Sequence, residues 1–221
     1  MQSPAAGKTA EEKFQDASDW ESVREMNYAN TTIARVIPGG SVLDLGCGNG
    51  MLLAEIAKKG ATCTGIDLSE KTAALARERG VDCRVHDLTE RLPFPDNSFE
   101  HVILLDVLEH VYYPGEVLRE ATRVSSKYVY ISTPNFVSLP ARIQVLCGRV
   151  PENNKPRMGH VYWMTQAVVS GLARQAGLVL DESYNNTFWE DKPLVGSVTR
   201  ALVRVWPSLF ALSFVARFRK V

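Results

Sequence analysis

A glycine loop that follows an aspartate is the first feature of this chain with clear chemical potential. Asp44 precedes the loop Gly46-Cys47-Gly48-Asn49-Gly50. Glycine lets a ligand approach the backbone closely, and an open α/β sheet binds ligands where its strands end. Met51 stands where the dinucleotide fingerprint needs its third glycine, and the loop lacks the lysine of a P-loop. Because the carboxylate of Asp44 would repel a pyrophosphate, the loop favours a cationic ligand such as an ammonium or sulfonium group.

Two more aspartates follow the next two predicted strands. Asp67 ends the second strand, where a carboxylate can accept from a pair of ribose hydroxyls. Asp87 ends the third strand and can accept from an exocyclic amine such as adenine N6. Each acid alone also fits a structural role, with Asp44 as a turn residue, Asp67 as a helix cap and Asp87 as a loop residue. Their recurrence at successive strand ends favours a ligand site.

Histidine is the side chain best suited to accept a proton near neutral pH. His86 and His101 lie within or beside predicted strands, so we interpret both as structural. His110 follows the fourth predicted strand, and His160 lies in the irregular segment 136–162, close to Tyr162 and Trp163. Both are candidate catalytic bases. The alternatives are a packing role for His110 and, for His160, a lid residue that only closes the pocket.

No metal site is predicted. Glu109 is next to His110, and because adjacent residues of a helix do not face each other, Glu109 is not expected to orient His110. No cluster of acids and histidines has the spacing of metal ligands along the sequence.

The chain around these residues alternates between strand-like and helix-like segments. The predicted strands are 41–45, 61–66, 81–85, 100–105, 128–132, 178–184 and 209–218. The predicted helices are 11–36, 51–59, 70–79, 114–124, 166–176 and 195–205. This alternation predicts an α/β fold with a mainly parallel sheet and helices on both faces. We expect a flexible tail at 1–10 and one domain at 11–221, with 136–162 as an irregular, lid-like insertion.

Composition limits the function classes. The 221 residues are 45% hydrophobic, which indicates a globular chain. The 25 basic and 25 acidic residues balance, so no nucleic-acid partner is predicted. The four cysteines are scattered without a C-x-x-C pair, and the first residues lack the apolar core of a signal peptide. A cytoplasmic protein with free thiols is therefore expected.

Several motifs together resemble the class I S-adenosylmethionine-dependent methyltransferases. They are VLDLGCGNG (42–50), GIDLS (65–69), HDL (86–88), FPDNSFEHVILLDVLEHV (94–111) and LREATRVSSKYVYISTPN (118–135). PNF (134–136), LCGRVPE (146–152) and GHVYWMT (159–165) are similar to MetW-type proteins, while DVLEHV is nearer to ubiquinone-biosynthesis methyltransferases. The resemblance implies a Rossmann-like, seven-stranded sheet that is mostly parallel. Its last strand would be antiparallel and at the edge.

The resemblance also implies a cofactor, S-adenosylmethionine, and a set of cofactor-binding residues. The loop and its acid would surround the methionine portion, Asp67 would hold the ribose, and Asp106 with Val107 would face the methionine end. The full set is Asp44, Gly46, Cys47, Gly48, Gly50, Asp67, Leu68, Asp87, Leu88, Asp106 and Val107. Leu68 would flank the adenine, and Asp87 with Leu88 would contact its edge.

We therefore expect methyl transfer to a small-molecule acceptor, with an oxygen nucleophile as the first hypothesis. One alternative is a MetW-like accessory protein that acts through a partner enzyme. Another is an NAD-dependent oxidoreductase, which the missing third glycine and Asp44 oppose. The sequence leaves the oligomeric state open.

The C-terminal region suggests a weak peripheral membrane contact. From Lys192 onward the chain carries six basic residues and no acid. The predicted helix there has an apolar side that includes Val198, Leu202 and Val205. Such a helix can lie in a membrane interface. The alternative is that its apolar side packs on the sheet.

Overall fold

The computed structural model describes residues 25–155, 158–188 and 192–221. The strands are β1 (Ser41–Leu45), β2 (Thr62–Asp67), β3 (Asp82–Val85), β4 (Phe99–Leu105), β5 (Ser125–Pro134), β6 (Leu178–Thr187) and β7 (Ala211–Lys220). The helices are α2 (Tyr28–Val36), α3 (Met51–Ala57), α4 (Glu70–Glu78), α5 (Pro114–Val124), α6 (Leu139–Leu146), α7 (Gln166–Gln175), α8 (Pro193–Val205) and α9 (Pro207–Phe210), with short 3₁₀ turns η2 (Leu108–His110) and η3 (Glu152–Asn154). The expected tail at 1–10 and the start of the predicted helix 11–36 lie outside the described residues.

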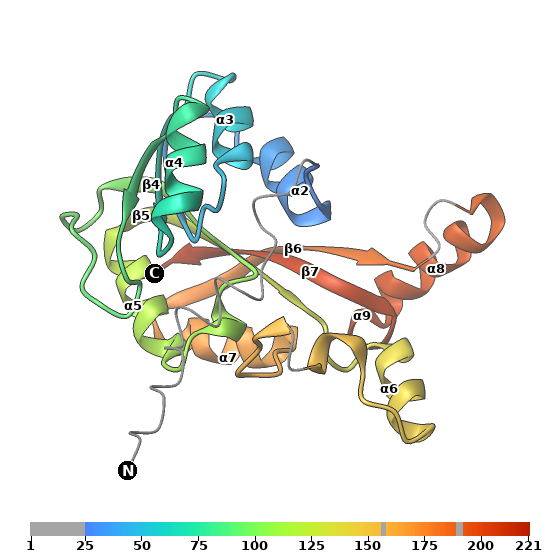
Figure 1. Ribbon diagram of the computed structural model, residues 1–221. Coiled ribbons are helices and arrows are strands. Elements are labelled where there is room, and N and C mark those ends of the chain that lie inside the picture. The colour runs from blue at the N-terminus through green and yellow to red at the C-terminus, as the bar shows by residue number, and fades with distance from the viewer. Residues whose placement is uncertain (1–24, 156–157, 189–191) are drawn as a thin grey trace, which may run out of the picture.

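One seven-stranded sheet organises the molecule, in the order β3-β2-β1-β4-β5-β7-β6 (Figure 1). The strands from β3 to β5 run parallel, and β7 runs antiparallel to both of its neighbours. The mostly parallel Rossmann-like sheet is confirmed, and so is the antiparallel last strand. Its placement at the edge is wrong, because β7 lies between β5 and β6. The side chains of Phe214, Val215 and Phe218 on β7 are almost fully buried, which an edge position would not provide.

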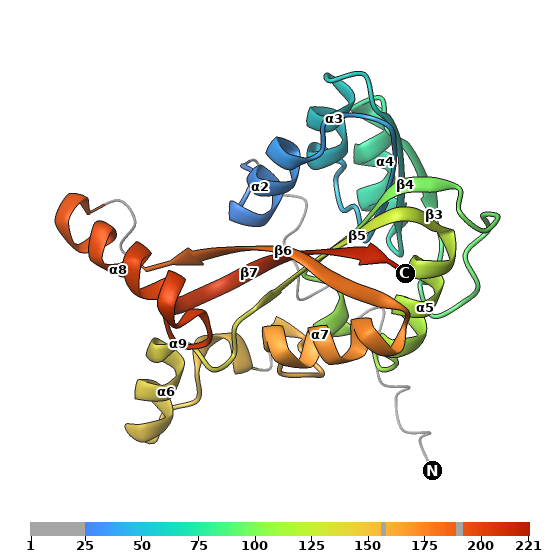
Figure 2. The ribbon, with the colours of Figure 1, turned by 180° about the vertical axis from the view of Figure 1, so that it is seen from behind.

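Helices cover both faces of the sheet, as predicted (Figure 2). One face packs against α2, α3 and α4 through residues such as Ile33, Leu53 and Ala73. The other face packs against α5 and α7 through Leu118 and Val169 among others. Alternating β-strand residues therefore supply two separate cores, and the carboxyl ends of β1 to β5 are left at one rim of the sheet.

Local signals explain where several helices begin. The hydroxyl oxygen of Ser69 accepts from the backbone N–H of Thr72, which caps α4, and Thr165 caps α7 in the same way through Val168. Pro114 occupies the first turn of α5, where its missing N–H has no cost. The prediction that the segment 136–162 is irregular is wrong in part. Residues Leu139–Leu146 form α6, which projects from the same end of the molecule as α8 and α9 (Figure 1).

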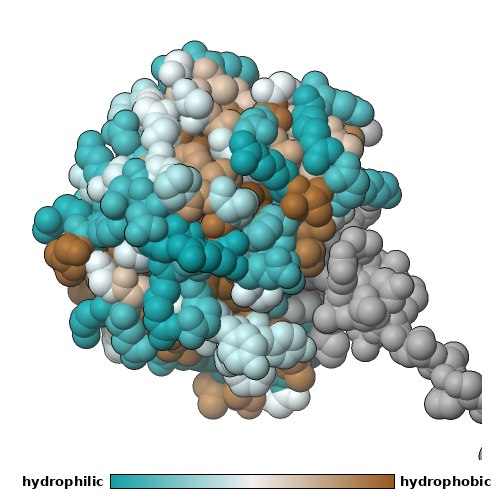
Figure 3. Space-filling view, turned by 90° about the vertical axis from the view of Figure 1, so that its left-hand side faces the viewer, coloured by the Kyte–Doolittle hydropathy of each residue, from teal (hydrophilic) through white to brown (hydrophobic). Residues whose placement is uncertain are grey.

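None of the helices among the described residues is long and apolar enough to cross a membrane. The end of the molecule away from α6 and α8, which faces the viewer in Figure 3, is mostly hydrophilic with scattered hydrophobic side chains.

Candidate active site

The glycine loop connects β1 to α3 in a backbone shape that favours glycine. Gly46, Gly48 and Gly50 all have positive φ angles, of 84°, 53° and 74°. A Cβ on Gly46 would lie 2.7 Å from Cγ2 of Val107, whereas a Cβ on Gly48 would meet nothing within 4 Å. The loop is therefore closed on the side of Val107 and open beside Gly48. That open side is where a ligand can approach the backbone.

Cys47 lies in the loop, but its side chain points away from the open side. Its Sγ is 3.3 Å from Sγ of Cys83 on β3 and fills the space beside Gly65 on β2. A Cβ on Gly65 would be only 2.5 Å from this sulfur atom. The predicted cofactor role of Cys47 is therefore limited to its backbone, because the thiol packs behind the loop.

Two carboxyl groups lie beside the loop. Asp44 is 4% exposed, and its burial together with the charge of Asp67 raises its pKa to about 7. Asp67 accepts from the Gly48 N–H (2.8 Å) through Oδ2 and from Ser69 N–H and the Thr72 hydroxyl through Oδ1. A carboxylate offers about four acceptor positions, so one position of Asp67 remains for a ribose hydroxyl. The prediction from sequence missed Thr72, whose position two residues into a helix carries no distinctive signal.

The predicted adenine-side residues lie at the exposed rim. Oδ1 of Asp87 accepts from the backbone N–H and the hydroxyl of Thr89, each at 2.8 Å, which fixes this carboxyl group in a turn. Leu68 is 37% exposed, and Leu88 packs partly against the core. The contact of these residues with adenine stays a prediction.

Asp106 occupies a strained position directly after β4. Its φ angle is +54°, which is uncommon for a residue with a side chain and is typical of functional sites. The Ser132 hydroxyl donates to Oδ1 (2.8 Å), and the Asp106 N–H donates to the Ser132 carbonyl (3.1 Å). Burial raises the pKa of Asp106, and the Ser132 hydrogen bond and the charge of His160 oppose that rise. Ser132, at the end of β5, was not singled out in the sequence.

The two candidate bases meet, although fifty residues separate them. The rings of His110 and His160 have centroids 4.7 Å apart, and Phe136 contacts His160 edge to face at 5.3 Å. The backbone N–H groups of Val161 and Tyr162 donate to the Glu109 carbonyl (2.7 and 3.2 Å). These bonds hold the segment that carries His160 against the 3₁₀ turn η2, which carries His110.

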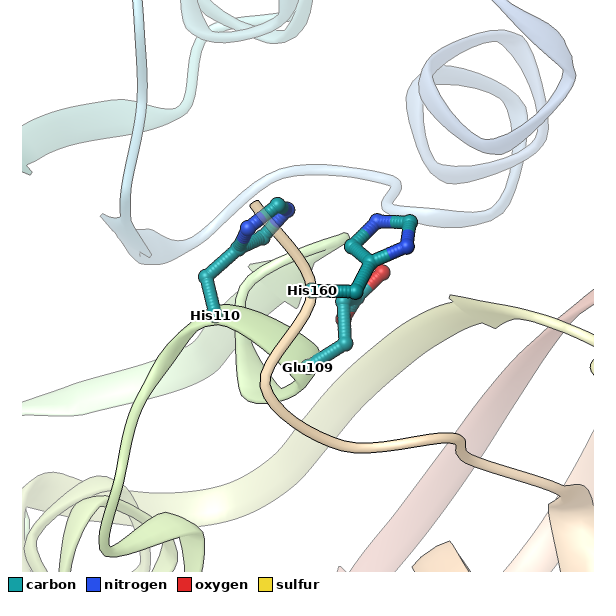
Figure 4. A group of neighbouring side chains, drawn as sticks. All are labelled: Glu109, His110 and His160. Atoms are coloured by element: carbon teal, nitrogen blue, oxygen red, sulfur yellow. The ribbon is translucent and has the colours of Figure 1, made fainter. Parts of the chain in front are cut away.

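Glu109 lies beside His110 and His160 and forms a cluster with them (Figure 4). Its side chain is fully buried, and among the described residues neither carboxyl oxygen has a hydrogen-bond partner. Figure 4 shows its carboxyl group pointing toward the His160 ring. Burial, followed by the charge of Asp106, raises the pKa of Glu109 well above its ordinary value. Burial and the charge of His160 lower the pKa of His110 to about 4, so that ring is neutral at pH 7.

The remaining histidines lie elsewhere. His101 is buried, with Nδ1 3.1 Å from the Tyr130 hydroxyl, which agrees with its structural interpretation. His86 follows β3 and is half-buried. The structure thus brings together His110 and His160, and separates them from the other two.

The sequence was compared with models of known protein families. Residues 28–170, more than half of the chain, match the family model of the methionine biosynthesis protein MetW. The chain belongs to the MetW family. This MetW-family chain is 34% identical over 186 residues to the bifunctional methionine biosynthesis protein MetXA/MetW of Rhodopirellula baltica, covering 75% of the chain and 29% of that protein.

The MetW-family chain is also similar to curated methyltransferases. It is 34% identical over 157 residues to the ubiquinone biosynthesis O-methyltransferase of Chromobacterium violaceum, covering 65% of the chain and 66% of that enzyme. The corresponding enzyme of Thiobacillus denitrificans is 31% identical over 162 residues, with 69% and 70% covered. The chain thus spans less than a third of the bifunctional relative and about two thirds of these enzymes.

Solved structures share the fold. A methyltransferase from Archaeoglobus fulgidus aligns with a TM-score of 0.66 at 18% identity, covering 94% of this chain and 99% of that one. Magnesium protoporphyrin IX methyltransferase from Synechocystis PCC 6803, solved with bound SAH, aligns with a TM-score of 0.64 at 16% identity, covering 95% and 93%. The MetW-family chain therefore has the class I methyltransferase fold. S-adenosylmethionine is the cofactor that its open glycine loop and adjoining carboxyl groups fit.

Proposed function

We propose that this protein transfers the methyl group of S-adenosylmethionine to an oxygen atom of a small-molecule acceptor. The observation that carries the proposal is the placement of His160. This histidine is held against the 3₁₀ turn that follows the strained Asp106, at the rim where the methionine end of the cofactor is expected. The similarity to ubiquinone biosynthesis O-methyltransferases supports an oxygen nucleophile.

The tautomer of His160 suits a proton acceptor. Its Nδ1 lies 2.6 Å from the carbonyl oxygen of Asn153. A carbonyl oxygen only accepts, so Nδ1 carries the proton of the neutral ring and Nε2 keeps a lone pair. Phe136 packs on the edge of the ring and limits its rotation. A hydroxyl group of the acceptor, placed near Nε2, can pass its proton to His160 as its oxygen takes the methyl group.

The other residues act by binding and alignment. The cofactor supplies an electrophilic methyl group on a sulfonium centre when it is bound. Asp44 places negative charge beside the cationic methionine end, and the loop around Gly48 lets the cofactor approach the backbone. Alignment of nucleophile, methyl group and sulfur can lower such a barrier by about 7–11 kcal/mol. The exposed Tyr112, Tyr162 and Trp163 lie on or near the same segments and would form the entrance for the acceptor.

The proposal is tested by finding an acceptor. The protein is incubated with methyl-labelled S-adenosylmethionine and a panel of phenols, alcohols, carboxylic acids and amines. We expect labelled product and stoichiometric demethylated cofactor with one of the oxygen acceptors. Transfer to amines alone would contradict the oxygen assignment, and cofactor binding without any transfer would favour the accessory role.

Asp67→Ala should weaken cofactor binding at least tenfold. Loss of hydrogen bonds to a charged group costs about 1.5–3 kcal/mol, and the substitution also releases the Gly48 N–H that shapes the loop. Calorimetric titration with S-adenosylmethionine measures the effect. Asp82→Ala is the matched control, because Asp82 is an exposed aspartate on β3 that pairs only with Arg84 among the contacts described. Equal affinity of the Asp67 variant and the control would exclude Asp67 as a cofactor ligand.

The accessory role remains a second candidate, supported by one comparison. The Rhodopirellula baltica relative is a bifunctional MetXA/MetW protein, so a MetW-like unit is joined there to another unit. Under this reading the chain binds a partner enzyme. Co-purification of a larger protein in a defined ratio, measured by mass, would support it.

We also propose a weak contact of α8 with an anionic membrane surface. Val198, Leu202 and Val205 are 58%, 38% and 85% exposed, so these three side chains are not covered by the sheet. The helix packs instead through Gly196, Thr199 and Val203. Exposed apolar side chains also lie on and after α6, at the same end of the molecule (Figure 2): Ile143, Val145, Leu146 and Val150.

The charge of this end matches an anionic surface. Residues 133–151 and 192–221 contain no acid, and Arg142, Arg149, Arg200 and Arg204 are exposed. The basic tail is not one continuous surface, however, because Arg217 on β7 pairs with Asp181 and Glu182 of β6. Each exposed basic residue near such a surface contributes about 1 kcal/mol, which gives weak and salt-sensitive binding.

Flotation with vesicles that contain phosphatidylglycerol should recover the protein at low salt and lose it at high salt. Val205→Glu should abolish flotation, because it places a negative charge at an apolar position of α8 that is 85% exposed. Val179→Glu is the matched control, at a 45% exposed valine on β6. Absence of flotation at low salt, or equal flotation of both variants, would contradict the membrane contact. A stable complex with another protein instead would assign the same end to a partner.

A further inference from the structure

Three side chains beside the expected methyl acceptor have the chemistry of a metal site. Glu109, His110 and His160 each offer one ligand atom, and these atoms all lie within 4.8 Å of one another. The glutamate and His110 come from the turn η2, and His160 comes from the segment that is hydrogen-bonded to it (Figure 4). The three residues therefore approach one point from two sides.

The buried carboxyl group of Glu109 is the independent sign of a ligand. The side chain is 0% exposed, and both of its oxygens lack a hydrogen-bond partner among the described residues. Buried polar groups in proteins are almost always satisfied, because an unsatisfied one is destabilising. A cation bound through one oxygen of this carboxyl group would supply a partner that the described residues do not.

The outer contacts of the two histidines are those of metal ligands. Nδ1 of His160 faces the Asn153 carbonyl (2.6 Å), and Nδ1 of His110 faces the Gly159 carbonyl (3.3 Å). Because a carbonyl accepts the Nδ1 proton, Nε2 is the basic nitrogen of each neutral ring. Histidines that bind metals almost always donate their other N–H to a backbone carbonyl or a carboxylate, which orients the ring.

The ligand set selects the class of ion. Two imidazoles and one carboxylate suit zinc and related transition metals, whereas magnesium and calcium prefer oxygen ligands. Nitrogen and oxygen ligands of tetrahedral zinc lie about 3.3 Å apart at bond lengths near 2.0–2.1 Å. One ligand atom from each residue lies within 4.8 Å of the others, so tetrahedral spacing would require side-chain rotations that bring these atoms closer by up to about 1.5 Å.

We propose that Glu109, His110 and His160 bind one divalent transition-metal ion, with zinc as the best match. Three protein ligands leave a fourth position open, as catalytic zinc sites do. On the proposed function, and only on it, that position would take the oxygen atom of the methyl acceptor. A bound ion would then lower the pKa of the acceptor hydroxyl, so that its proton passes to solvent before the methyl transfer, and His160 would serve as a ligand instead of as the base.

Metal binding is measured directly, without turnover. Tag-free protein is treated with a chelator and titrated with Zn²⁺ by calorimetry and with Co²⁺ by visible absorption, which reports tetrahedral coordination. Every titration is made in the Cys147→Ser background, because Cys147 is an exposed thiol that can bind zinc adventitiously. We expect one ion per chain, with an absorption band of a tetrahedral nitrogen and oxygen site.

Variants locate the ion. Glu109→Gln keeps the volume of the side chain but removes its charge, and His160→Ala removes one nitrogen ligand. Each should weaken binding at least about a hundredfold, since even loss of an outer contact costs 10- to 100-fold. His86→Ala, a half-buried histidine outside the cluster, should bind normally. Circular dichroism and thermal unfolding confirm that each variant is folded.

Two results would overturn the proposal. One is no binding of Zn²⁺ or Co²⁺ at millimolar concentration in the parent protein. The other is binding that Glu109→Gln and His160→Ala leave unchanged. Stoichiometric binding with the expected losses, in a protein that methylates no hydroxyl acceptor, would support the metal site and contradict the proposed transfer.

Discussion

Replacing His160 with alanine should lower the turnover of an identified oxygen acceptor by about a hundred- to ten-thousand-fold. The residue presents Nε2 as an acceptor because Nδ1 is committed to the Asn153 carbonyl at 2.6 Å. Its removal leaves the acceptor hydroxyl without a proton acceptor. Initial rates at saturating acceptor measure the loss. The affinity for S-adenosylmethionine should stay within about threefold, because His160 contacts η2 rather than the glycine loop.

His110→Ala provides the comparison. The low pKa of His110, about 4, makes this ring a poor proton acceptor at pH 7, so its loss should reduce turnover less than the loss of His160. Near-normal turnover of the His160 variant would mean that an already ionised nucleophile reacts by alignment alone. A larger loss in the His110 variant would transfer the role of base to that residue.

Affinity for S-adenosylmethionine should increase with pH up to about 7 and then level off. Burial and the charge of Asp67 raise the pKa of Asp44 to about 7, so Asp44 is protonated in the free protein below that value. The cationic cofactor favours the ionised form, and binding below pH 7 must therefore release a proton. Each pH unit below 7 should cost about tenfold, or about a hundredfold between pH 7 and pH 5.

Titrations between pH 5 and pH 7 test this dependence, in a range where the α-amino group of the cofactor remains mostly charged. Asp44→Asn is nearly isosteric and cannot ionise. Its affinity at pH 7 should be about tenfold lower or worse, and it should vary little with pH. A parent protein with a flat profile would show that Asp44 is already ionised or does not face the cofactor.

The sequence was enough to place the predicted cofactor residues at one rim of the sheet, for a simple physical reason. Asp44, Asp67 and Asp87 follow parallel strands, and the carboxyl ends of parallel strands meet at one rim regardless of how the remaining loops pack. Positive φ at Gly46 and Gly48 is equally local, because it depends on the absence of a Cβ. The short-range sequence pattern is therefore enough to predict such features.

The acceptor half could not be read from the sequence in the same way. Glu109 and His160 are roughly fifty residues apart, and they meet only because Val161 and Tyr162 donate to the Glu109 carbonyl. The rule for neighbouring residues of an α-helix also did not apply to Glu109, because residues Leu108–His110 form a 3₁₀ turn instead. Side-chain pattern alone likewise could not show that Val198 and Val205 of α8 face outward. Such contacts depend on tertiary packing.

The position of β7 between β5 and β6 has a consequence for the order in which the protein folds. Residues Ala211–Lys220 emerge last among the seven strands during synthesis, yet they are the one strand with which β6 pairs in the described parts of the chain. Until β7 appears, β6 has no neighbour, and the outer side of β5 is an open hydrogen-bonding edge. Such an edge is prone to pair with other chains. The glycine loop and its acids can form earlier, because β1 to β5 precede β6 and β7 in the chain. The nascent chain can thus form the glycine loop and its acids before β7 has been made. It then depends on β7 to pair with β5 and cover the open edge of that strand.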